Sequence, residues 1–130
     1  MTTMMGHTAL VLFALATMAA TPDTEVSSLA HGNMAVGQKF EIQTTDHVFR
    51  GELLDRATGL CQMAVSRDGA TFTPARTVYL LGATAGPQDR QMLVLMHEVK
   101  LGMKMELATD DLQQKNRLIT SEVKAIKLRR

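Results

Sequence analysis

The chain has 130 residues, of which 45% are hydrophobic, 21% charged and 4% aromatic, a composition that fits one globular domain and excludes a disordered chain. Its formal net charge of +1 excludes a bulk electrostatic attraction to nucleic acid or anionic lipid. A single cysteine, Cys61, excludes an internal disulfide and a zinc site built from several cysteines.

The first feature along the chain is an apolar run over residues 8–20, which has the length of a signal-peptide core. It is too short for a transmembrane helix, which needs about 20 apolar residues. If residues 1–20 are a signal peptide, the protein is secreted or periplasmic. Residues 1–7, however, contain no Lys or Arg, whereas secretory signals normally begin with positive charge.

A later start of translation is the alternative interpretation. Met34 directly precedes the first predicted strand and is well placed to initiate the chain. Residues 1–33 would then be a mis-assigned extension, and the protein would be cytoplasmic. Under both interpretations residues 34–130 form a single small domain.

The next part of the chain has the pattern of short strands. Residues 38–44 alternate between apolar and polar side chains, as a half-buried strand does. Residues 48–54 return as the partner strand of a hairpin, and residues 60–66 follow after a turn. One face of this third strand is expected to point inward, namely Cys61, Met63 and Val65.

Two turn signals divide the middle of the chain. Arg67-Asp68-Gly69 predicts a tight hairpin, and Pro74, which cannot donate to a strand ladder, marks a break before a strand over residues 77–81. Residues 82–89 are expected to form a loop. The continuous apolar run over residues 92–96 is short for a helix and predicts a buried strand.

The C-terminal segment completes the pattern. Residues 110–115 are polar and predict a hairpin loop, and residues 117–128 predict a strand. The apolar spacing of this strand changes from three to two, which predicts a bulge over residues 121–124. Six to eight short strands separated by turns predict an all-β fold, a small and partly open barrel.

Two of the predicted strands have similar sequences. Residues 36–46 align without gaps to residues 101–111, and Gly, Lys, Glu, Thr and Asp recur at the same offsets. Strands that begin after a Gly turn and end at an Asp turn converge on such patterns. A duplicated strand-turn element is the alternative explanation.

A second pattern suggests a family. The strand around Phe49-Arg50-Gly51-Glu52-Leu53 has the form aromatic-x-Gly-x-Leu, and a later strand ends in Leu80-Leu81-Gly82. Over residues 37–82 this resembles the Sm-like small barrels, which implies a strand bent at Gly51. The Met-Asn pair of that family's RNA-binding loop is absent, and the second motif lacks its Arg. The resemblance therefore implies a barrel without that family's route to RNA.

Two histidine-acid pairs are candidate metal ligands. His47 beside Asp46 and His97 beside Glu98 could together hold a divalent cation. Adjacent residues on a strand point to opposite faces, so each pair offers one ligand to a common site. No metal site is therefore predicted.

Cys61 is the only candidate nucleophile of the cysteine type. A reactive thiol needs a neighbour that lowers its pKa, and the residues around Cys61 supply none. Because no Gly-rich phosphate loop joins a strand to a helix, no nucleotide cofactor is expected. We therefore predict a buried Cys61, no catalytic residue and no cofactor.

Basic residues gather at the C-terminus. Six basic residues and one acidic residue lie within residues 115–130, a local charge of +5. Lys124, Lys127, Arg129 and Arg130 are therefore the candidate nucleic-acid contacts. The alternative is a solvated strand whose charges protect a sheet edge.

These features predict a non-catalytic binding module. Its partner is expected to be another protein or a second copy of the chain, because the strand edges of small open barrels are often closed by another subunit. The alternatives are an RNA-binding module that uses the basic C-terminal strand, and a small secreted or periplasmic β domain.

Overall fold

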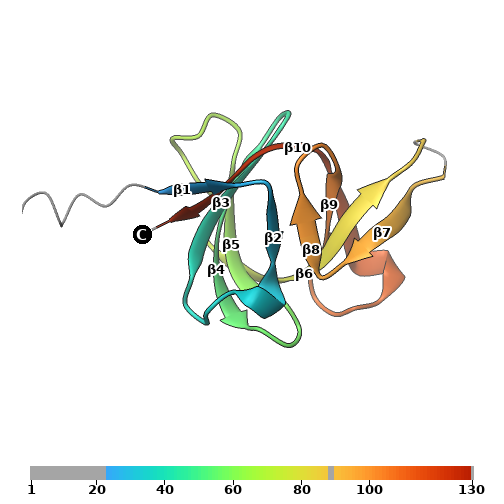
Figure 1. Cartoon of the computed structure of the whole chain (residues 1–130), viewed down its shortest axis with the longest axis horizontal. Coiled ribbons are helices and arrows are strands. Elements are labelled where there is room, and N and C mark those ends of the chain that lie inside the picture. The colour runs from blue at the N-terminus through green and yellow to red at the C-terminus, as the bar shows by residue number, and fades with distance from the viewer. Residues whose placement is uncertain (1–22, 88–89, 130) are drawn as a thin grey trace, which may run out of the picture.

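The structure, a computed structural model, describes residues 23–87 and 90–129. Within these residues the chain forms strands and two 3₁₀ turns but no α-helix, so this part of the protein is all-β, as the sequence predicts (Figure 1). In chain order the elements are β1 (Thr24–Val26), β2 (Ser28–Ala30), η1 (His31–Asn33), β3 (Lys39–Thr44), β4 (Val48–Asp55), β5 (Leu60–Ser66), β6 (Arg76–Ala85), β7 (Met92–Met96), β8 (Glu98–Lys100), β9 (Lys104–Ala108), η2 (Gln114–Asn116) and β10 (Arg117–Arg129).

Six of the strands pair in a ring. Each neighbour in the order β10, β3, β4, β5, β6, β9 is hydrogen-bonded to the next, and β9 pairs back to β10. All of these pairings are antiparallel. β1 extends the sheet beyond β10, β7 extends it beyond β6, and β2 pairs with β8 apart from it. The arrangement is a small, partly open barrel, as predicted.

The long strand β6 explains the open part of the barrel. Its first half, residues 76–79, pairs with β5, and its second half, residues 82–85, pairs with β7. Residues 79–84 pair with β9 along the other edge. β7 therefore projects beyond the ring as an edge strand (Figure 1).

The barrel interior is filled by one face of each strand. Its largest fully buried side chains include Phe40, Ile42, Leu53, Leu80, Met105 and Ile126. Cys61 and Met63 are buried and Val65 is partly buried against the core, which confirms the inward face predicted for β5. Gly51 is needed for packing, because a Cβ there would collide with the ring of Phe40.

The last strand bends as predicted. Its register shifts between Ile119 and Glu122 against β9, and between Val123 and Ala125 against β3. These irregularities fall on the predicted bulge, residues 121–124, and they let one strand pair with β9 and then with β3.

Two predictions in the middle of the chain are wrong. The expected loop over residues 82–89 is partly strand, because β6 continues through Gly82 to Ala85 with an irregular register at Gly82. Residues 92–96 do form a strand, but it is not buried. A run that is apolar at every position gives no alternation from which to distinguish a buried strand from an apolar edge.

Residues before Met34 also take part in the fold. β1 pairs with β10, β2 pairs with β8, and both Leu29 and His31 are buried. These residues belong to the segment that the sequence analysis assigned to an extension. The apolar run over residues 8–20 lies outside the described residues.

Candidate functional site

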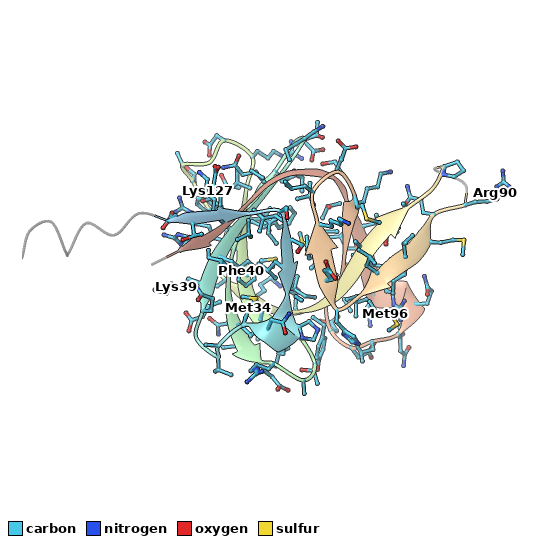
Figure 2. The ribbon with its side chains drawn as sticks, in the orientation of Figure 1. Met34, Lys39, Phe40, Arg90, Met96 and Lys127 are labelled. Atoms are coloured by element: carbon cyan, nitrogen blue, oxygen red, sulfur yellow. The ribbon has the colours of Figure 1, made fainter. Side chains whose placement is uncertain are left out.

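The exposed face of β7 is the most unusual surface of the described chain. Met92, Val94 and Met96 alternate along one face and are 69%, 56% and 65% exposed. We call these three residues the apolar edge. Figure 2 shows β7 projecting from the barrel between the labelled Arg90 and Met96. Large apolar side chains clustered on one exposed strand are typical of an interaction surface.

The backbone of β7 is also free on one side. Among the described residues β7 pairs only with β6, so its other edge presents unpaired N–H and C=O groups. The register against β6 is irregular: Leu95 faces Ala83 and Leu93 faces Thr84, which leaves Val94 without a partner on β6. No charged residue lies within the strand to discourage a further strand from pairing there.

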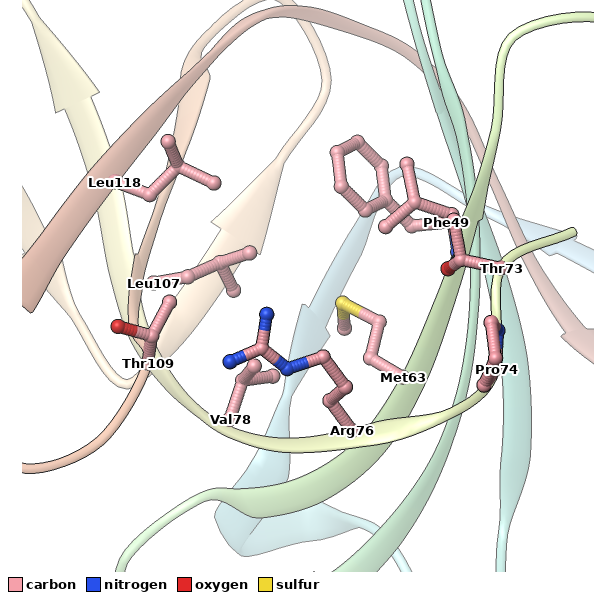
Figure 3. A pocket seen from close by; sticks show the side chains of 10 residues that line it. Phe49, Met63, Thr73, Pro74, Arg76, Val78, Leu107, Thr109 and Leu118 are labelled. Atoms are coloured by element: carbon pink, nitrogen blue, oxygen red, sulfur yellow. The ribbon is translucent and has the colours of Figure 1, made fainter.

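A cavity of about 390 Å³ opens at another part of the barrel (Figure 3). Its walls come from five strands, β4, β5, β6, β9 and β10, from the segment between β5 and β6, and from Thr109 directly after β9. The lining residues are Phe49, Met63, Val65, Thr73, Pro74, Arg76, Val78, Leu107, Thr109 and Leu118. The mouth of a β-barrel is a common place for a small-molecule site, and the volume lies in the usual range.

One charged group enters this cavity. The guanidinium of Arg76 is directed toward Leu107 in Figure 3. The cavity lining contains no acidic residue, and Arg76 forms no ion pair among the described residues. Arg76 was not a candidate from the sequence, because most of its neighbours in the cavity come from β4, β5, β9 and β10 and are distant along the chain.

A pair of histidines joins η1 to the turn between β7 and β8. His31 Nδ1 lies 2.6 Å from the carbonyl oxygen of Arg56 and therefore donates to it. In the neutral pair His31 Nε2 accepts, so His97 Nδ1, 3.0 Å away, is the donor. The backbone of His97 has φ 65°, a left-handed conformation rare outside glycine, and its N–H donates to Leu81 at 2.7 Å. This network fixes the C-terminal end of β7.

The predicted histidine-acid pairs do not meet. His47 Nδ1 and Asp46 Oδ1 lie 2.9 Å apart in the turn between β3 and β4, whereas His97 contacts His31 rather than Glu98. Hydrogen bonds from Ser121 and His47 hold the pKa of Asp46 at about 2. In the part of the chain that the structure describes, no group of three or more His, Cys, Asp or Glu could hold a metal ion.

Cys61 is buried in the core, as predicted. Its Sγ donates a hydrogen bond to the carbonyl of Gly59 at 3.3 Å. Burial raises the pKa of the thiol to about 12. Because the thiolate is the reactive form, Cys61 is not a ready nucleophile near neutral pH.

Two of the candidate basic residues of β10, Lys124 and Lys127, lie beside acids. Lys124 Nζ lies 2.5 Å from Glu122 Oε1. Lys127 lies opposite Glu41 on β3 and opposite Glu25 on β1. Arg129 lies at the end of the sheet, opposite Lys39, and Arg130 lies outside the described residues.

No family model, curated protein or solved structure matches the chain. Residues 23–87 and 90–129 contain no helix with the length and apolar character that a membrane span requires.

Proposed function

We propose that the protein is a non-catalytic assembly module that pairs with a second copy of itself through β7. The observation that carries the proposal is the apolar edge, three large exposed side chains on a strand whose outer backbone groups have no partner among the described residues. Addition of a strand would satisfy these backbone groups and cover apolar surface in one step.

The sequence of β7 favours a second copy as the partner. It reads Met-Leu-Val-Leu-Met and is the same in both directions. In an antiparallel pair centred on Val94, each Met92 would face the partner's Met96, each Leu93 the partner's Leu95, and the two Val94 side chains each other. Both faces of the joined sheet would then be apolar and matched in size.

The charges on the barrel support the assembly module over the nucleic-acid alternative. The candidate contacts Lys124 and Lys127 lie beside acidic groups, Glu122 for the first and Glu25 and Glu41 for the second. Binding to a phosphate backbone draws on unopposed positive charge, and among the described candidate contacts only Arg129, opposite Lys39, lies away from an acid.

Sedimentation equilibrium over a wide concentration range tests the proposal. The wild-type chain should form a dimer that dissociates on dilution, since one five-residue strand pair is a small interface. Val94→Lys places two like charges opposite each other at the centre, so it should raise the dimer dissociation constant by about tenfold or more.

A matched control separates this effect from a general effect of charge. Val36 is also an exposed valine, at 62%, but lies in the segment between η1 and β3. Val36→Lys should leave the dissociation constant unchanged. A wild-type chain that stays monomeric at all concentrations, or a Val94→Lys chain that dimerises like the wild type, would contradict the proposal.

A further inference from the structure

The cavity beside Arg76 has the character of a small-molecule site, separate from the apolar edge. Its floor is made of buried side chains, among them Phe49, Met63 and Leu107. Its rim includes Leu118, which is 49% exposed. No residue of β7 lines the cavity, so a ligand there does not depend on assembly.

The polar groups of the cavity favour an anion. Arg76 supplies the only charge in the lining, and its guanidinium presents a planar set of donors suited to a carboxylate. Thr73 Oγ1 accepts a hydrogen bond from the N–H of Val65 at 3.1 Å, which leaves its own hydrogen available. Thr109 already donates its hydrogen to Asn116 at 3.2 Å.

We propose that this cavity binds a small apolar monocarboxylate, such as a medium-chain fatty acid or an aryl carboxylate. The hydrocarbon part lies against the apolar walls, and the carboxylate pairs with the guanidinium of Arg76. The single guanidinium of the lining matches one carboxylate, whereas a phosphate ester would leave further oxygens without donors. The exposure of Arg76 lets it meet the ligand from solvent.

Titration of the ¹⁵N-labelled chain with octanoate, followed by NMR, tests the proposal. Octanoate should shift backbone signals of the cavity residues, and octan-1-ol should bind at least about tenfold more weakly, because it lacks the charge that pairs with Arg76. Arg76→Gln should weaken octanoate binding by about tenfold and remove the preference for octanoate over octan-1-ol. The control Arg67→Gln, at an exposed arginine outside this cavity, should change neither.

A second pair of variants tests the location. Leu118 and Leu112 are exposed to similar degrees, 49% and 53%, but only Leu118 lines the cavity. Leu118→Glu places an acid beside the ligand carboxylate and should reduce octanoate binding, whereas Leu112→Glu should not. Absence of octanoate binding to the wild-type chain, equal binding of octanoate and octan-1-ol, or equal effects of the two glutamates would overturn the proposal.

Discussion

Glu106 of β9 aligns with Glu41 of β3 when residues 101–111 are matched to residues 36–46. Each of the two carboxylates pairs with an arginine on the next strand of the chain. Arg50 Nε lies 3.0 Å from Glu41, and Arg117 Nη1 lies 3.3 Å from Glu106. Both glutamates are buried. β3 and β9 also both pair with β10. The two segments of similar sequence, residues 36–46 and 101–111, therefore resemble each other in their ion pairs and in their place in the sheet.

The two ion pairs differ in their surroundings. Burial opposes ionisation of Glu41, but hydrogen bonds from Gln43 and Arg50, with the charges of Arg50 and Lys127, lower its pKa. Arg50 also stacks on Phe72, with its guanidinium carbon 4.4 Å from the ring centre. Loss of Arg50 therefore leaves Glu41 with other polar partners.

Glu106 depends more on its arginine. Besides Arg117 it accepts one hydrogen bond from a side chain, from Thr84 Oγ1 at 2.7 Å. Arg117→Met should lower the free energy of unfolding by about 3 kcal/mol, because it leaves a buried carboxylate without a counter-charge. Arg50→Met should cost less, and urea denaturation of both variants measures the difference.

A double variant checks the cause of that loss. Glu106→Leu combined with Arg117→Met removes both charges and should recover most of the stability. If the double variant is as unstable as Arg117→Met alone, lost packing of the arginine rather than an uncompensated charge explains the effect.

The turn after β5 should give the protein a defined response to acid. Hydrogen bonds from the backbone N–H groups of Thr71 and Ala70, and from the hydroxyl of Ser66, lower the pKa of Asp68 from 3.8 to about 2. A carboxyl group whose pKa is lower in the folded state stabilises that state at pH values above its unfolded-state pKa. This stabilisation is lost as the pH falls toward the folded-state pKa.

The comparison of wild type with Asp68→Ala isolates this contribution. The difference in their free energies of unfolding should be constant above about pH 5 and should shrink as the pH falls from about 4 to about 2. Urea denaturation at a series of pH values measures it. A difference that does not change with pH would contradict the role of the Asp68 carboxylate.

Local patterns were sufficient to predict the central strands of the barrel. The period of two over residues 38–44 and 60–66 reflects one buried and one exposed face, and it identified β3 and β5. The change of spacing near Val123 located the bulge of β10 because a bulge alters which residues face inward.

Features that depend on distant partners were not predictable. β2 and β8 have three residues each and pair across most of the chain, and His31 and His97 are 66 positions apart. The cavity brings Arg76 of β6 together with residues of β4, β5, β9 and β10, which are distant from it in the sequence. The exposure of Met92 follows from the place of β7 in the sheet, which its composition does not reveal.

The N-terminal strands should contribute to stability. A chain that begins at Met34 lacks β1, β2 and the buried Leu29, and loss of one buried leucine costs about 2–5 kcal/mol. Its melting temperature should be more than about 10 °C below that of a chain that begins at Asp23. Thermal unfolding followed by circular dichroism compares the two, and equal melting temperatures would contradict the structural role of these strands.

The most direct test of self-assembly through β7 is native mass spectrometry of a mixture of Val94→Lys and Val94→Glu chains. Because the proposed pairing places the two residues 94 opposite each other, each variant alone should be monomeric, whereas the mixture should form a dimer that contains one chain of each kind. A mixture that contains only monomers, or dimers in the proportions of random pairing, would contradict the account.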